Sequence, residues 1–171
     1  INLSKYHYCV DVDIKGFFDN VNHGKLLKQI WTLGIRDKRL ICIISKMLKA
    51  EIDGEGVPEK GTPQGGLLSP LLSLIVLNEL DWWVSSQWET FQPKNRSKNG
   101  WLQYAKKYTK LKSGFIVRYA DDFKIMCSTY GEAQRFYHST VDFLNKRLKL
   151  EISPEKSKVV NLKKNSSDFL G

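Results

Sequence analysis

The sequence has few cysteines, no long apolar run and no low-complexity segment. Each of these absences excludes a class of protein. The three cysteines, Cys9, Cys42 and Cys127, are odd in number and far apart, and none belongs to a Cys-x-x-Cys pair. This excludes a disulfide-stapled domain, gives no indication of a zinc site, and predicts reduced cysteines buried in the core. The longest apolar stretch, 67–80, is shorter than the ~20 residues that span a bilayer, so we expect a core helix and no membrane partner.

The composition is that of one globular domain with a basic charge balance. Of 171 residues, 42% are hydrophobic, and 27 Lys and Arg against 18 Asp and Glu give a formal net charge of +9. A chain of this size and apolar content can bury its own core, which excludes intrinsic disorder. The chain opens on Ile1 rather than Met and stops at 168–171 without a closing element. We therefore expect an excerpt of a longer protein, truncated at both ends.

The positive charge is concentrated between residues 90 and 120, which include eight Lys or Arg and no acid, with aromatic residues among them. Lys and Arg displace counterions from phosphates, and flat rings stack on bases, so we expect the segment 90–113 to be an RNA-binding insertion. A solvated loop whose lysines only aid solubility is the alternative. The residues expected to contact RNA are Lys106, Lys107, Lys110, Lys112 and Arg118.

Hydrophobic periodicity predicts an α+β domain. Apolar and polar residues alternate over 6–14, which predicts a strand whose last residues point carboxylates out of the sheet. Helical spacing predicts helices over 25–34, 37–50, 67–88 and 132–148, and β-rich runs predict strands over 114–118, 123–127 and 158–162. Asp37 is the expected N-cap of the second helix, and Ser69 and Pro70 the expected N-cap and first residue of the third. This order predicts an antiparallel sheet backed by helices, similar to a split βαβ unit.

Three aspartates are predicted to meet at one edge of this sheet. Asp13 ends the first strand, and Asp121 and Asp122 lie in the predicted hairpin turn 119–122. If these strands are neighbours, the carboxylates repel one another unless cations fill the site or some of the carboxyls are protonated. Oxygen ligands with open positions select Mg²⁺, and two such ions about 3.5–4 Å apart assist phosphoryl transfer. An ordinary acidic turn is the alternative.

Three motifs follow one another along the chain: DIKGFFD at 13–19, GTPQGGLLSP at 61–70 and RYADDF at 118–123. They closely resemble successive polymerase motifs of reverse transcriptases, above all those of group II intron maturases. Residues 150–158 resemble a fourth motif, and 169–171 resemble the start of a fifth. The resemblance covers nearly the whole chain from Tyr6 onward. It implies a right-hand polymerase palm with part of the fingers, present as a single fragment.

The resemblance also implies the metal ligands. Asp13 and Asp121 would bridge two Mg²⁺ ions, for which Mn²⁺ can substitute, and Asp122 would assist. The backbone carbonyl of Ile14 would be a further ligand.

The implied substrate contacts come from three of the motifs. Phe18 matches an aromatic gate that crowds a ribose 2′-OH and so favours deoxynucleotides. Gln64 would lie under the incoming nucleotide and the template base, and Gly65 would let the backbone approach them. Lys156 matches a position proposed to protonate the leaving pyrophosphate. The alternatives are a core position for Phe18, an ordinary loop position for Gln64 and a solvated side chain for Lys156.

The resemblance implies an RNA-directed DNA polymerase that extends a DNA or RNA primer with dNTPs on an RNA template. The parent protein would also bind intron RNA and assist splicing, in a bacterial cytoplasm or an organellar matrix. The alternatives are a reverse transcriptase of a retron, diversity-generating or CRISPR-linked lineage, and a non-catalytic RNA-binding splicing factor. The aspartate set argues against the last, because an unused carboxylate cluster only costs stability. We expect the fragment alone to be weak or inactive, because thumb helices and the triphosphate-binding fingers residues lie outside it, and nothing indicates an oligomeric state.

Overall fold

The computed structural model describes residues 5–52, 54, 56–63, 67–87, 90 and 113–169. Several residues with predicted roles lie outside these ranges, namely Gln64, Gly65, Lys106, Lys107, Lys110 and Lys112. In the described ranges, none of the helices combines the length and the apolar character needed to cross a bilayer.

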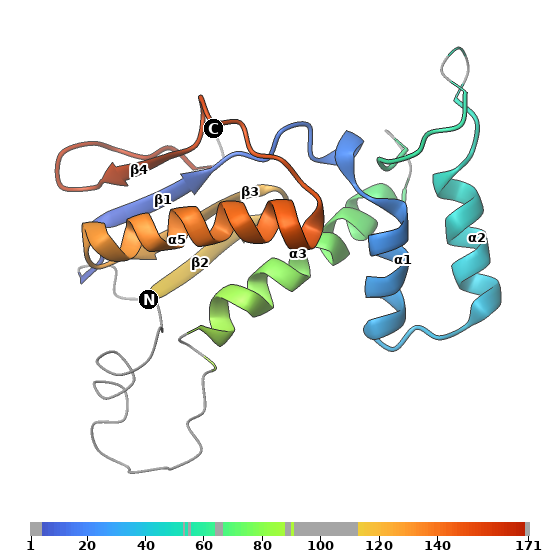
Figure 1. Ribbon diagram of the computed structural model, residues 1–171, viewed down its shortest axis with the longest axis horizontal. Coiled ribbons are helices and arrows are strands. Elements are labelled where there is room, and N and C mark those ends of the chain that lie inside the picture. The colour runs from blue at the N-terminus through green and yellow to red at the C-terminus, as the bar shows by residue number, and fades with distance from the viewer. Residues whose placement is uncertain are drawn as a thin grey trace, which may run out of the picture.

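A four-stranded antiparallel sheet with the order β2-β3-β1-β4 forms the centre of the structure (Figure 1). Its strands are β1 (Tyr8–Val12), β2 (Gly114–Tyr119), β3 (Asp122–Cys127) and β4 (Lys158–Asn161). β1 lies between β3 and β4, and Val10 and Val12 are buried in the core as predicted, while Cys9 on the other side of the strand is buried as well. The hairpin turn is shorter than predicted: Tyr119 pairs with Asp122, which leaves two residues in the turn. The antiparallel ladder extends to this point because each added pair satisfies backbone hydrogen-bonding groups.

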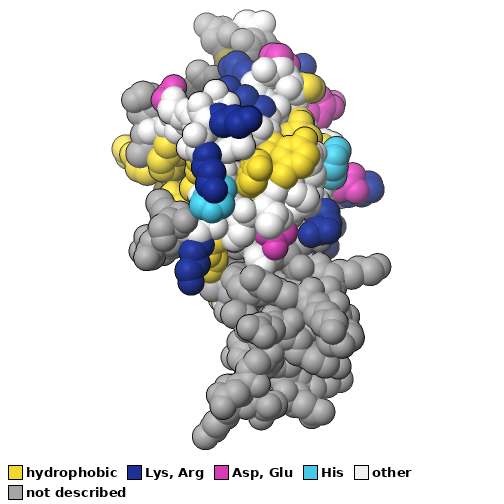
Figure 2. Space-filling model, turned by 90° about the vertical axis from the view of Figure 1, so that its left-hand side faces the viewer, with side chains coloured by type: hydrophobic (Ala, Val, Ile, Leu, Met, Phe, Trp, Pro, Cys, Tyr) yellow, Lys and Arg dark blue, Asp and Glu magenta, His cyan; other side chains and the backbone are white. Residues whose placement is uncertain are grey.

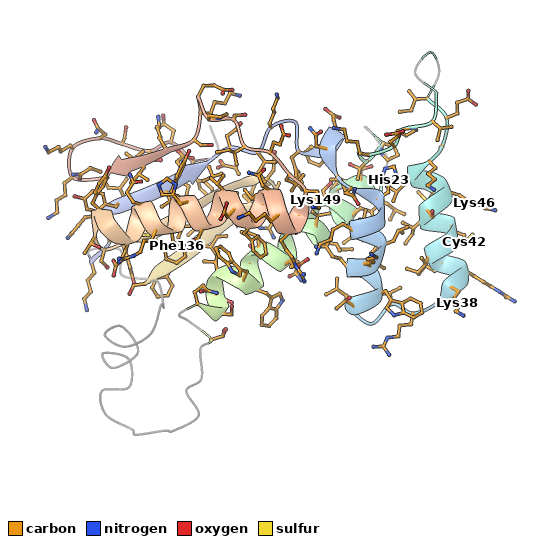
Figure 3. All side chains as sticks on the ribbon, in the orientation of Figure 1. His23, Lys38, Cys42, Lys46, Phe136 and Lys149 are labelled. Atoms are coloured by element: carbon orange, nitrogen blue, oxygen red, sulfur yellow. The ribbon has the colours of Figure 1, made fainter. Side chains whose placement is uncertain are left out.

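One long helix covers a face of the sheet. α5 (Tyr130–Phe143) continues as the π-helical turn η3 (Leu144–Leu148). Thr129 begins α5 with a capping box, in which its side chain accepts the N–H of Glu132 while the Glu132 carboxylate accepts the N–H of Thr129. Phe136 is fully buried in the core that α5 shares with the sheet (Figure 3).

α3 (Ser69–Ser86) packs against β2 and against α1, and runs diagonally between them in Figure 1. The predicted cap of this helix is wrong. Leu68 occupies the N-cap position, and Ser69 is the first helical residue, with its hydroxyl donating to the carbonyl of Pro63. Pro70 lies in the first turn, where its missing N–H leaves no helical hydrogen bond unmade.

α1 (His23–Thr32) and α2 (Lys38–Leu48) stand side by side at one end of the molecule, with α2 outermost (Figure 1). Asn22 caps α1 by accepting the N–H of Lys25, and Asp37 caps α2 as predicted. Cys42 corrects a prediction, because it lies exposed on α2, whereas Cys9 and Cys127 are buried. An apolar helix segment exposes part of its surface when the next layer of structure is not there to cover it.

Basic side chains are not confined to the segment 90–113. On the end of the molecule at the left of Figure 1, Lys and Arg side chains of the described residues lie around a hydrophobic patch, with acidic side chains also present on this face (Figure 2). The described surface therefore contributes to the net charge of +9.

Candidate functional site

Two aspartates lie at the ends of the neighbouring strands β1 and β3. The register ends with the pair Val12 and Phe123, and Asp13 and Asp122 are the next residues beyond this pair. Because side chains alternate along a strand, both leave the sheet on the face opposite to the one that α5 covers. We call this pair the acid rung. Asp121 lies one residue before it in the hairpin turn, so all three predicted acids come from one end of the sheet.

A later part of the chain lies against Asp13. The backbone N–H of Asp13 donates to the hydroxyl of Ser157 at 3.1 Å, and its carbonyl accepts the N–H of Ser153 at 2.9 Å. The ammonium of Lys156 lies 4.0 Å from a carboxylate oxygen of Asp13, with side-chain exposures of 68% and 44%. Ile14 follows directly and is buried. The first and fourth sequence motifs are therefore neighbours in space.

The turn that carries Asp121 is fixed by Arg118. Ala120 has a φ of 53°, a left-handed conformation that costs a non-glycine residue roughly 1–2 kcal/mol. Its carbonyl accepts a hydrogen bond of 2.7 Å from Nη1 of Arg118, whose Nε donates to Asp81 of α3 at 2.8 Å. Arg118, expected to contact RNA, thus ties the turn to α3. The Arg118 side chain is 13% exposed, and its guanidinium is occupied by these partners.

Phe18 lies beside the same turn. It begins the short 3-10 helix η2 (Phe18–Asn20), and its half-buried ring lies 5.3 Å from the buried ring of Phe17. Both rings line a pocket of about 410 Å³ together with Tyr119 and Ala120. The residue expected to exclude a ribose 2′-OH therefore shares one pocket with the hairpin turn.

The start of the second motif is fastened to η2. The N–H of Thr62 donates to the carbonyl of Phe18 at 2.8 Å, and His23 contacts the carbonyl of Gly61 at 2.7 Å. Gly61 has a φ of 97°, and a Cβ there would lie 3.0 Å from the backbone oxygen of Asp19. Only glycine fits this approach, so the start of the second motif is held at a fixed point beside Phe18.

A buried ion pair lies next to the acid rung. Lys124 of β3, two residues after Asp122, donates to Asp11 at 2.7 Å and to Ser167 at 2.9 Å. The Lys124 side chain is 7% exposed, and the pair Asp11–Lys124 is a rung of the β1–β3 ladder. Removing one partner of such a pair leaves an uncompensated buried charge, so the pair holds the two strands together where the acids begin.

The whole chain, residues 1–171, matches the family model described as reverse transcriptase (RNA-dependent DNA polymerase). The chain belongs to this family. It is 31% identical over 196 residues to the group II intron-encoded protein LtrA of Lactococcus lactis subsp. cremoris, with 90% of the chain and 33% of LtrA covered. It is 27% identical over 164 residues to protein YkfC of Escherichia coli strain K12, with 89% and 43% covered. This reverse transcriptase domain therefore spans about a third of the length of LtrA.

Solved structures confirm the fold. Telomerase from Candida albicans in complex with the TWJ fragment of telomeric RNA superimposes with a TM-score of 0.62 at 14% identity, covering 97% of this chain and 29% of that one. The apo telomerase from Candida tropicalis gives a TM-score of 0.60 at 15% identity, covering 94% and 29%. The predicted α+β palm, an antiparallel sheet backed by helices, is thus confirmed.

The acids of this reverse transcriptase domain fit Mg²⁺ by their donor type and exposure. Among the described residues, no three His, Cys, Asp or Glu side chains form a ready-made metal site. Mg²⁺ does not require one, because it binds through one or two carboxylates and completes its shell with water and phosphate. The Asp13 carboxylate is 44% exposed and leaves room for such ligands. The convergence of all three carboxylates on two ions stays a prediction.

The sequence did not reveal the groups that position the acids. Asp81 lies 37 residues before Arg118 on another element, and no local pattern links the two. Lys124 sits in a strand of apolar residues, and a charged residue there is the one signal that a buried partner exists. The hydroxyl of Ser157, which supports the backbone of Asp13, lies within the fourth motif but gave no separate signal.

Proposed function

We propose that this domain is the polymerase core of a group II intron type reverse transcriptase. It would add dNTPs to the 3′-OH of a DNA or RNA primer by attack on the α-phosphate, directed by an RNA template. The single observation that carries this proposal is the acid rung, with Asp121 beside it in the turn and Lys156 at 4.0 Å from Asp13. The 31% identity to LtrA supports the intron lineage.

The metal ligands we propose are Asp13, Asp121, Asp122 and the carbonyl of Ile14. When bound, two Mg²⁺ ions, or Mn²⁺ in their place, supply a Lewis acid that stabilises charge on the attacking and leaving oxygens. The chain contributes the geometry: Ser157 holds the backbone of Asp13, and the Arg118 clamp holds the turn of Asp121.

Two further side chains act on the nucleotide in this proposal. Lys156 donates a proton to the leaving pyrophosphate, and its 68% exposure lets the ammonium swing from Asp13 toward a phosphate. Phe18 fills the space beneath the sugar, so that a ribonucleotide is rejected by a clash with its 2′-OH. Gln64 and Gly65, which lie outside the described residues, hold the base pair in this proposal.

Primer extension by the full-length protein on an RNA template tests this function. Asp121→Asn should lower the rate of dNTP addition by about a thousandfold or more, because a neutral amide loses metal charge stabilisation worth several kcal/mol. Asp142→Asn, at an exposed acid on α5, is the matched control and should keep the parental rate. A parent that binds RNA but incorporates no dNTP would instead favour the non-catalytic splicing factor.

The sugar gate has its own test. Phe18→Ala should raise ribonucleotide incorporation relative to deoxynucleotide by about tenfold, which corresponds to removing a clash of ~1.4 kcal/mol. Phe136→Ala is the control: Phe136 is fully buried and does not line this pocket, so the change should lower stability and leave the sugar preference as it was. Unchanged selectivity in Phe18→Ala would assign Phe18 to the core.

The segment 90–113 is proposed to bind template or intron RNA. Replacing Lys106, Lys107, Lys110 and Lys112 together with Ala should flatten the slope of log affinity against log salt by up to about 0.7 per lost contact on single strands. Filter binding over a range of salt concentrations measures this slope. An unchanged slope would identify the segment as a solvated loop.

A further inference from the structure

A second pocket lies on the helical side of the sheet, between α1, α3 and η3, with a volume of about 430 Å³. This is within the range of roughly 300–1,000 Å³ typical of ligand sites. The acid rung leaves the sheet on the opposite face. Along α3, Leu74 lines the Phe18 pocket and the next residue, Ile75, lines this one, so the two pockets lie on different sides of the same helix. We call this second cavity the helix pocket.

The helix pocket contains a fixed charged network. The carboxylate of Glu79 accepts hydrogen bonds of 2.7 Å from both Lys25 and Gln29, and a further one from Arg147. Burial acts to raise the pKa of Glu79, but these hydrogen bonds outweigh it and leave the pKa below its usual value. Gln29 is 8% exposed and also donates to the carbonyl of Val76 at 3.2 Å. The carboxylate is therefore fully engaged by the protein.

Three other groups lining the helix pocket remain open to a ligand. Trp82 supplies the aromatic ring among the residues that line this pocket, and it is 62% exposed. Within the described ranges, no side-chain hydrogen bond or ion pair engages the ammonium of Lys28 or the amide of Asn78. The pocket thus offers a flat ring, one cation and one amide that can both donate and accept hydrogen bonds.

The charges select the class of ligand. Lys25, Lys28 and Arg147 against Glu79 give the helix pocket a formal charge of +2. A ligand with a flat aromatic face, hydrogen-bonding edges and a negative charge matches these groups. Nucleotides have all three features, and bases stack on exposed tryptophan with little dependence on sequence. Paired bases are already stacked and hydrogen-bonded, so only an unpaired nucleotide can present its face and edge together.

We propose that the helix pocket binds an unpaired nucleotide of single-stranded RNA, apart from the acid rung and the Phe18 pocket. The base stacks on Trp82, Asn78 hydrogen-bonds its edge, and Lys28 contacts the adjoining phosphate. Such a site gives the protein a hold on RNA that is independent of the polymerase reaction and does not rest on the proposed catalytic roles.

The full-length protein and a fluorescein-labelled single-stranded RNA octamer test this site by anisotropy. Excess unlabelled primer–template duplex is added first, to occupy the proposed polymerase site. Trp82→Ala should weaken octamer binding about tenfold, the loss expected for one stacked base. Trp31→Ala removes a 41% exposed tryptophan outside the pocket and should stay within about twofold of the parent. Lys28→Ala should flatten the salt slope by about 0.7.

Primer extension on the same variants separates this proposal from the polymerase assignment, because Trp82→Ala should extend primers at the parental rate. Parental octamer affinity in Trp82→Ala would overturn the proposal. An equal loss in Trp31→Ala would also overturn it, since the effect would then not belong to the helix pocket. Competition by AMP as strong as that of unlabelled octamer would assign the pocket to a free nucleotide and contradict RNA binding.

Discussion

The sheet with α5 and the pair of helices α1 and α2 bury their apolar residues very differently. In the first region, which we call the sheet body, Ile125, Cys127 and Phe136 have no exposed surface. In the second, the helical arm, α2 buries Ile44 and Leu48 against α1 but leaves Ile43 55% exposed. The sheet body is packed from several elements, whereas α2 is held by contacts with α1.

The difference matches where the candidate chemistry lies. The acid rung extends from two strands whose neighbours are fixed by a buried ion pair and by the Arg118 clamp. Acids that share metal ions must be held within fractions of an ångström, which a backbone supported on all sides provides. The helical arm contributes no acid to the rung, so its looser packing costs the site nothing. The two regions should therefore respond differently to the same perturbation.

Cysteine alkylation should give the largest contrast between the two regions. Burial raises the pKa of Cys127 from 9.0 to about 12, which lowers its thiolate fraction about a thousandfold before access is considered. Cys42 lies on the exposed side of α2, in a row with Lys38 and Lys46 (Figure 3). Iodoacetamide at pH 8 should therefore modify Cys42 more than about a thousand times faster than Cys127. Peptide mass spectrometry at timed intervals measures both rates, and similar rates would mean that the sheet body opens readily.

Truncation of a large side chain should give the second-largest difference between the two regions, measured as a loss of free energy of unfolding. Phe136→Ala should lower the free energy of unfolding by about 3–5 kcal/mol, because it leaves a cavity under α5. Ile43→Ala in the helical arm should cost less than about 1 kcal/mol, since its side chain is already half in water. Urea unfolding of both variants checks this, and an equal loss would show that the arm is packed as firmly as the sheet body.

Two glycines sharpen the comparison within the sheet body itself. A Cβ at Gly114 would lie 2.6 Å from Cε2 of Phe136, so Gly114→Ala should cost about 1–3 kcal/mol through overpacking. Gly131, in the first turn of α5, has no heavy atom within 4 Å of an added Cβ. Gly131→Ala should therefore add up to about 1 kcal/mol through helix propensity. Thermal unfolding of the Gly114→Ala and Gly131→Ala variants measures both changes in stability. A Gly114→Ala variant as stable as the parent would contradict the described packing.

The smallest expected effect concerns the cap of α2. Asp37→Ala removes the side chain that accepts the N–H groups of Arg39 and Leu40, at a cost of about 1 kcal/mol. Because α2 contacts little besides α1, the loss should be local. Amide hydrogen exchange should accelerate in α2 and remain unchanged in β1. Faster exchange in β1 as well would mean that the arm and the sheet body unfold as one unit.

The sequence predicted where the helices and strands lie, but it predicted less well which residues contact them. The alternation over β1 and the helical spacing of α5 follow from short-range periodicity, and both are found in the structure. The cap at Ser69 was wrong because the hydroxyl of Ser69 has a partner in Pro63 that lies outside the helix. Cys42 was expected in the core, because an apolar run shows which residues avoid water but not whether a partner covers them.

In the candidate site, too, one part could be predicted from the sequence and another part could not. Asp13 and Asp122 lie just beyond the last paired residues of β1 and β3, so their place at one end of the sheet was predictable from the strand ends, while their meeting at shared metal ions stays a prediction. The clamp from Arg118 to Asp81 depends on how α3 crosses the hairpin, which no local pattern encodes. Charge patterning alone favoured RNA binding for Arg118, because the partner that occupies its guanidinium is distant in sequence.

Binding of Mn²⁺ to the full-length protein, counted by electron paramagnetic resonance, tests most directly whether the end of the sheet is a metal centre. The parent should bind Mn²⁺, and Mg²⁺ should displace it. Asp13→Asn/Asp121→Asn should lose most of this binding while its melting temperature without metal stays the same or rises, because like charges are removed. The exposed-acid control Asp142→Asn should bind as the parent does. Unchanged Mn²⁺ number and affinity in the double variant would contradict a metal centre built on these aspartates.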